Sequence, residues 1–290
     1  MLWCDGRVNH DANRPFRWDL VRPDQLGTLL DGTRPPDLWF LDELIDCAAK
    51  VLARSGDGEI YFVGRSADSV FDFLSGALAG TDWAQRLHQL PMSLGAVNTW
   101  MGQLDQQETE RLRANMSASG LTPHRLARGR RPAVFVDIVS SGGTYECLYG
   151  ELRRWISDER EAWDVVRRKL RFLGLTCRKQ TSPNTFRWQQ HAEWTEEIPA
   201  SAIGNVSVDA GVYSYFADRQ TKLTPSFARW SWADPNVATP DHGQRTRQAL
   251  AEAVALVEAG RNNRDRLVKV IVAEPTFAEP WLRSAVNQLR

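Results

Sequence analysis

The feature that most constrains the fold of this chain is an apolar run that ends in an acid and a loop of small residues. The run covers residues 133–136 and is rich in residues that favour strands. Such a run, without polar alternation, indicates a parallel strand that is covered on both faces. Asp137 ends the run, and a helical pattern follows over residues 145–156. The stretch therefore predicts a strand–loop–helix unit of an α/β protein.

The loop of this unit has the composition of a phosphate-binding loop. Gly142 and Gly143 can adopt backbone conformations that turn successive amide groups toward one point. The N-terminus of the following helix would face the same point with its partial positive charge. Ser140, Ser141 and Thr144 add hydroxyl groups. We therefore expect residues 140–144 to form a phosphate cup that needs no lysine.

This stretch resembles the phosphoribosyl pyrophosphate (PRPP) loop of type I phosphoribosyltransferases. In that family an apolar strand and two acids precede a Thr/Ser-Gly-x-Thr sequence, and the stretch Ser141-Gly142-Gly143-Thr144 fits its last four positions. Asp137 aligns with the second acid, whereas Val136 stands where the first acid should be. Ser140 takes the position of an aspartate that purine-salvage members carry near the base. The alternative interpretation is a glycine-rich turn of another doubly wound protein.

A second loop of the same kind follows an earlier buried strand, at residues 60–63. Gly64, Arg65 and Ser66 come directly after this strand, and a helical pattern follows them. In type I phosphoribosyltransferases the loop after the first core strand holds the pyrophosphate, and the resemblance implies this role here. A guanidinium group is suited to it because its N–H groups fork onto phosphate oxygens. The alternative is that Arg65 merely pairs with a local acid such as Asp68.

The resemblance implies an enzyme that binds Mg²⁺-PRPP and transfers phosphoribose to a nitrogen nucleophile, a nucleobase or an amine, with release of pyrophosphate. Asp137 and Arg65 would be the catalytic residues, and Asp137 would hold Mg²⁺ through water. In the family, the segment past the last core strands often helps to hold the base. This implies that Trp188 stacks on the base and that Arg187 reads its edge.

Two other functions remain open. The first is a PRPP- or nucleotide-sensing regulator that kept the fold without the reaction; Val136 in place of the first acid favours it, because one carboxylate fewer weakens the hold on ribose and metal. The second is a hydrolase or ligase of a sugar phosphate, but the sequence has no GxSxG, HExxH or Walker A pattern. The five histidines have no metal-binding spacing.

Composition restricts the partners and the compartment. Lys plus Arg equals Asp plus Glu at 36 each, so the net charge gives no sign of a nucleic-acid or membrane partner. There is no transmembrane-length apolar run and no secretory signal pattern. The four cysteines form no CxxC pair and are typical of reduced thiols in a cytoplasmic protein. The expected partners are PRPP and an acceptor, with a second copy of the chain as a further candidate.

The predicted organisation has three parts: an N-terminal arm over residues 1–36, an α/β core over 37–200 and an extension over 201–290. The core is expected to hold a mostly parallel sheet flanked by helices, as in type I phosphoribosyltransferases. Its strands are expected at residues 60–63, 90–94, 133–136 and 170–176. A flexible lid is expected either at residues 96–105 or in the basic piece 119–131; the alternative for the arginines of the basic piece is a solvated surface loop. The extension is unassigned to residue 236 and helical from residue 239 onward.

Overall fold

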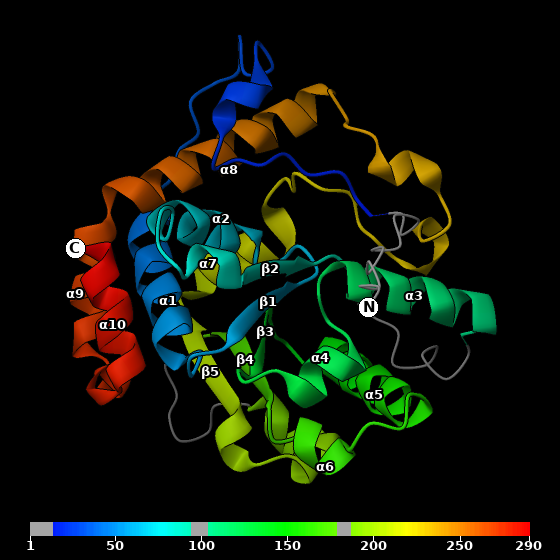
Figure 1. The fold of residues 1–290 in the computed structure, drawn as a ribbon. Coiled ribbons are helices and arrows are strands. Elements are labelled where there is room, and N and C mark those ends of the chain that lie inside the picture. The colour runs from blue at the N-terminus through cyan, green and yellow to red at the C-terminus, as the bar shows by residue number, and fades with distance from the viewer. Residues whose placement is uncertain (1–13, 94–103, 179–186) are drawn as a thin grey trace, which may run out of the picture.

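The centre of the molecule is a five-stranded parallel sheet with helices on both faces (Figure 1). The computed structural model describes residues 14–93, 104–178 and 187–290. Within these residues the strands stand in the order β2-β1-β3-β4-β5, and every neighbouring pair is parallel. The strands are β1 Glu59–Val63, β2 Leu87–Leu90, β3 Ala133–Ile138, β4 Leu170–Cys177 and β5 Ile203–Val208. The predicted α/β class is therefore confirmed.

Alternation along the strands gives each face of the sheet its own apolar layer. Phe62 and Val136 belong to one buried cluster, and Tyr61 and Phe135 belong to the other. The helices over the first face are α1 Leu41–Arg54, α2 Asp68–Ala77 and α7 Ala210–Ser214. The helices over the second face are α3 Gln106–Ala118, α4 Pro123–Arg128, α5 Gly143–Asp158 and α6 Trp163–Val166. The fold is thus a three-layer α/β/α arrangement.

Two strands differ from the sequence-based expectation. β2 occupies residues 87–90 and not 90–94, and within it only Leu90 is fully buried. It lies at an edge of the sheet with β1 as its one neighbour, so it needs no continuous apolar run. β5 at the other edge lies within residues 201–236, so the sheet continues past residue 200.

The basic piece over residues 119–131 is an ordered part of the fold, not a flexible lid. It contains α4, whose first turn is capped by the Thr122 side chain. The Nζ atom of Lys169 donates to three backbone carbonyls at the end of this helix, those of Leu126, Ala127 and Gly129. Of the other candidate for a lid, residues 96–105, the part 96–103 lies outside the described residues.

The N-terminal arm and the C-terminal extension both pack on the core. In the arm, Trp18 is buried in a cluster with residues of α8 (Gln244–Asn262). Helix α8 crosses α2 in backbone contact, since a Cβ on Gly260 would lie 2.0 Å from the carbonyl oxygen of Phe73. Helix α9 (Arg264–Ala273) packs against α1, and α10 (Pro280–Leu289) packs against α9. The end of the extension is therefore helical as expected, but its first helix begins at residue 244 and not at residue 239.

No helix in the described ranges is long and apolar enough to span a bilayer. Cys47, Cys147 and Cys177, the cysteines within those ranges, form no disulfide.

Candidate functional site

The two predicted phosphate loops leave the sheet at the same edge, next to each other. β1 and β3 are adjacent and parallel, so the residues that follow them lie at the carboxyl edge of the sheet. From β1 the chain goes to β2 on one side, and then crosses to β3 on the other side. The strand order therefore reverses between β1 and β3. Crevices at such reversals are the usual ligand sites of open parallel sheets.

The loop after β3 is shaped by one glycine. Gly142 has a φ of +88°, and a Cβ at this position would lie 2.6 Å from Cε3 of Trp188. The first hydrogen bond of α5 runs from the Glu146 amide to the Gly142 carbonyl, so the amides of residues 143–145 have no acceptor within the helix. Ser140 and Ser141 are exposed beside them. The amides of residues 143–145 are thus left without a helical acceptor, and the backbone conformation at position 142 requires glycine.

Asp137 is buried behind this loop. It is 6% exposed, its Oδ1 atom accepts a 2.7 Å hydrogen bond from the Ile138 amide, and its carboxyl group also bonds to the Thr144 side chain. Burial raises the pKa of Asp137 to about 8, although these bonds and the charge of Lys222 act to lower it. At neutral pH the group is therefore mostly a neutral carboxylic acid.

Lys222 lies against the loop after β1, and the sequence did not assign it a role. Its Nζ atom donates to the carbonyls of Phe216, at 2.7 Å, and Ser66, at 3.3 Å, and to Oε1 of Gln220, at 2.7 Å. Burial lowers the pKa of Lys222 to about 8, and the nearby charge of Arg65 lowers it further. The segment that carries it lies far along the chain, so no local pattern marks it as part of this site.

Arg65 lines a cavity of about 710 Å³ at the carboxyl edge. One guanidinium nitrogen donates to the Thr224 carbonyl at 3.1 Å. The cavity is also lined by Lys222 and by residues of the arm and the extension, including Trp18 and Arg245. Gly64 lines a separate, smaller cavity of about 260 Å³. Residues 140–144 line neither of these two cavities.

Asp68, the local acid that could have paired with Arg65, pairs with a different arginine. Asp68 pairs with Arg17 of the arm at 2.9 Å, and the same guanidinium pairs with Asp72 at 2.5 Å. These three side chains are at least nine-tenths buried. Arg65 is therefore not held by Asp68, and the arm contributes a buried ion-pair network directly behind the loop.

The structure corrects the expected base platform. Trp188 is 1% exposed, packs over Gly142 and Tyr145, and donates its Nε1–H to Oδ1 of Asn205 at 2.7 Å. Both its faces and its polar atom are used inside the protein, so it offers no surface to a base. Arg187 is exposed next to it. The residues directly before Arg187, 179–186, lie outside the described residues.

The described side chains do not form a protein-held Mg²⁺ site. Among them no group of three His, Cys, Asp or Glu residues could hold a metal ion. Asp137 is the carboxyl group at the loop, and a buried neutral acid is a poor ligand for a hard cation. We therefore assign no step to a metal held by these residues.

Comparison of the chain with protein-family models, curated proteins and solved structures finds no significant match. Its function must be inferred from the residues at the sheet edges themselves.

Proposed function

We propose that the carboxyl edge of the sheet binds PRPP and that the protein transfers phosphoribose to a nitrogen nucleophile. One observation carries the proposal: two loops of phosphate-binding type follow adjacent parallel strands on the two sides of a strand-order reversal. The similarity of residues 137–144 to the PRPP loop is the reason for choosing PRPP as the ligand. The cavity next to Arg65 offers room for the pyrophosphate group.

Each loop has a separate role in this proposal. The amides of residues 143–145 and the hydroxyls of Ser140 and Ser141 bind the 5′-phosphate. Arg65 binds the pyrophosphate, with the charge of Lys222 behind it. Asp137, as a neutral acid at neutral pH, orders the loop through its hydrogen bonds to Ile138 and Thr144.

The reaction requires little covalent chemistry from the protein. A nitrogen of the acceptor attacks C1′ of the ribose, the bond from C1′ to the pyrophosphate oxygen breaks, and its electron pair leaves with pyrophosphate. The proton of the attacking nitrogen passes to solvent. Arg65 and Lys222 stabilise the charge that develops on the leaving group, and the phosphate cup fixes the ribose in position. Mg²⁺, in this proposal, enters and leaves with the pyrophosphate and is not held by the chain.

A second candidate function is supported by the burial of Asp137. A carboxyl group that is 6% exposed and neutral at pH 7 is poorly placed to bind ribose hydroxyls or to stabilise positive charge on the sugar. Together with Val136 in place of the first acid, this favours a protein that binds PRPP or a nucleotide without turnover. The two candidates share the ligand and differ in the reaction.

The test is to measure PRPP binding by calorimetry, with and without Mg²⁺, and pyrophosphate release with a panel of purines, pyrimidines and amines. Arg65→Ala should weaken PRPP binding by about tenfold or more and leave ribose 5-phosphate binding nearly unchanged, because only PRPP carries the pyrophosphate. Firm binding without release for any acceptor would favour the sensor. Absence of PRPP binding by the folded wild-type protein would refute both functions.

A further inference from the structure

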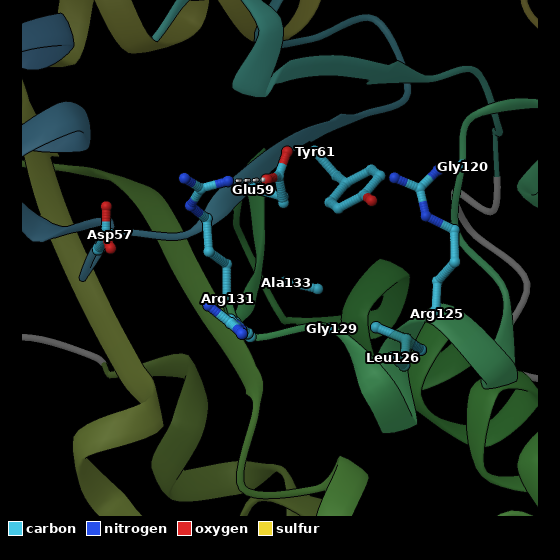
Figure 2. A pocket seen from close by; sticks show the side chains of 10 residues that line it. Asp57, Glu59, Tyr61, Gly120, Arg125, Leu126, Gly129, Arg131 and Ala133 are labelled. Atoms are coloured by element: carbon cyan, nitrogen blue, oxygen red, sulfur yellow. Dashed lines mark hydrogen bonds and ion pairs between the residues drawn. The ribbon is translucent and has the colours of Figure 1, made fainter. Parts of the chain in front are cut away.

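A further cavity lies at the opposite, amino edge of the same sheet (Figure 2). Its volume is about 490 Å³, within the range of small-molecule sites in proteins. Glu59 and Ala133, the first residues of β1 and β3, form one wall, and α4 with the turn after it forms the other. We call this cavity the amino-edge pocket. Its lining residues are Asp57, Glu59, Tyr61, Gly120, Arg125, Leu126, Gly129, Arg130, Arg131 and Ala133.

The acids of the pocket are already neutralised by partners. Asp57 pairs with Arg86. Glu59 pairs with His88 at 2.9 Å and with Arg131 at 3.2 Å, and the Glu59–Arg131 contact is visible in Figure 2. These contacts, with the hydrogen bond from His88 as the largest cause, hold the pKa of Glu59 below its ordinary value. The acidic wall therefore adds little free negative charge.

Two arginines of the pocket, in contrast, have no such partner. Neither the Arg125 nor the Arg130 guanidinium makes a hydrogen bond or an ion pair with any described residue. In Figure 2 the Arg125 side chain extends along the pocket beside the ring of Tyr61. The uncompensated charge of the pocket is thus positive, and it is carried by groups that can fork onto an oxyanion.

An independent observation that points to a ligand is the hydroxyl group of the buried residue Tyr61, which is unpartnered in the described part of the chain. The residue is 4% exposed, and its ring is stacked on His88 at a centroid distance of 4.7 Å and packed on Phe135 at 5.7 Å. Its hydroxyl points into the pocket in Figure 2 and has no hydrogen-bond partner among the described residues. Burial raises the pKa of Tyr61 to about 12, so the hydroxyl keeps its proton and can donate it to an acceptor in the pocket.

The frame of the pocket is held in place before any ligand arrives. Lys169 binds the three carbonyls at the end of α4, and the Gly129 amide donates to the Arg125 carbonyl at 2.7 Å. Gly120, with a φ of +79°, lets the Arg125 guanidinium pack directly on the backbone, since a Cβ there would lie 2.5 Å from its Nη1. A preformed frame lowers the entropy cost of binding.

We propose that the amino-edge pocket binds the phosphate group of a small phosphorylated metabolite, with Arg125, Arg130 and the Tyr61 hydroxyl as its donors. A dianion with at least three acceptor oxygens matches two unpaired guanidinium groups and one hydroxyl better than a single carboxylate does. The volume exceeds that of a bare phosphate ion and leaves room for a sugar or a nucleoside. The site is separate from the carboxyl edge and does not rest on the function proposed for that edge.

The test is calorimetric titration in phosphate-free buffer of low ionic strength, with inorganic phosphate, ribose 5-phosphate, AMP and adenosine as probes. We expect AMP or ribose 5-phosphate to bind the wild type and adenosine not to bind. Arg125→Gln should weaken that binding by about tenfold or more, and Tyr61→Phe by about threefold to tenfold. The matched control is Arg128→Gln on the same helix, because Arg128 pairs with Glu161 and does not line the pocket. The affinity of this variant for the same probe should stay within about twofold of the wild-type value.

The variants also separate this site from the carboxyl edge. Gly142→Ala, which disturbs the phosphate cup of the carboxyl edge, should leave AMP binding unchanged at temperatures where the variant is folded. If Gly142→Ala abolishes the binding while Arg125→Gln and Tyr61→Phe keep it, the anion lies at the other edge and the proposal is wrong. Absence of binding for every phosphorylated probe, or equal affinity for adenosine and AMP, would also overturn it. Tyr61→Phe keeps the ring that packs in the core, so the test stands even where Arg125→Gln lowers stability.

Discussion

The cationic side chains at the two edges of the sheet differ in the partners that they have inside the protein. At the carboxyl edge, Arg65 donates to a backbone carbonyl, Lys222 to three oxygens, and Arg17 to two buried aspartates. At the amino edge, Arg125 and Arg130 have no comparable partner within the described ranges. A cation that is satisfied inside the protein must give up part of its bonding to bind a ligand, whereas an unsatisfied one is available at once.

This difference shows which groups each edge can offer. The carboxyl edge can contribute mainly backbone amides, those of residues 143–145, and their direction depends on one glycine. The amino edge can contribute mainly side chains, whose positions depend on how α4 is held. Backbone geometry and side-chain charge can be changed separately by mutation, so the comparison can be tested from both sides.

The largest effect is expected for Gly142→Ala. The left-handed backbone costs a non-glycine residue about 1–2 kcal/mol, and a methyl group forced against Trp188 costs about 1–3 kcal/mol more. We expect the free energy of unfolding to fall by about 2–5 kcal/mol and PRPP binding to be lost. AMP binding at the amino edge should persist at temperatures where the variant is folded.

The matched control is Gly150→Ala in α5, the helix that Gly142 precedes. A Cβ on Gly150 meets nothing within 4 Å, and alanine is the better helix former by about 1 kcal/mol. Urea unfolding should therefore show this variant to be as stable as the wild type or more stable. Similar stability losses for the two variants would mean that the loop does not depend on the conformation of Gly142.

The next effect is the pH dependence that Asp137 gives to stability. The pKa of Asp137 rises from an ordinary 3.8 to about 8 in the fold. Between these values the folded state keeps a proton that the unfolded chain has released. The free energy of unfolding therefore falls as pH rises, by up to about 1.4 kcal/mol per pH unit. Asp137→Asn cannot titrate, so it should lose this slope.

The measurement is urea unfolding of both proteins at pH 5 and pH 7. The stability of the wild type relative to Asp137→Asn should fall over this interval by up to about 3 kcal/mol. Asp72, whose pKa burial raises to about 6, titrates in both proteins, so its contribution cancels in the difference. Equal slopes for the two proteins would show that Asp137 is ionised in the fold, and that the carboxyl edge carries a negative charge.

Local patterns were enough to predict the loop after β3. A buried run, an acid and two glycines specify a strand, a turn and a helix start without help from distant residues. Helix α8 was expected for the same reason, because its apolar residues repeat at helical spacing. β5 was not found, since it lies at a sheet edge and alternates. Its place in the sheet depends on its pairing with β4.

Long-range packing explains what the sequence could not reveal about the two sites. Lys222 becomes buried only because its loop folds over Ser66, some 156 residues earlier. Trp188 belongs to the core only because Gly142 and Asn205 meet it there. From the sequence, the arginines of residues 119–131 could be interpreted as part of a solvated loop. Only the fold brings them next to Tyr61.

A smaller effect is expected for Lys169→Met, which tests whether the bonds that hold α4 in place also position the arginines of the amino edge. The change removes the donor that binds the carbonyls at the end of α4, which should cost about 1–3 kcal/mol of stability. Because Arg125 and Arg130 lie on and after this helix, AMP affinity should fall as well, while PRPP affinity stays. Arg168→Met, at an exposed neighbouring position, should change neither quantity. An unchanged AMP affinity in a folded Lys169→Met protein would mean that the frame does not position the arginines.

The smallest effect concerns the one paired arginine of the pocket. Arg131 and Glu59 are both partly exposed, so their ion pair adds at most about 1 kcal/mol to stability. Arg131→Gln should nevertheless weaken AMP binding by about twofold to fivefold, because it leaves the Glu59 charge less neutralised beside the bound phosphate. Glu59→Gln combined with Arg131→Gln should restore the affinity. If the double variant binds no better than Arg131→Gln, then Arg131 contacts the phosphate directly, and the division between paired and unpaired arginines at this edge does not hold.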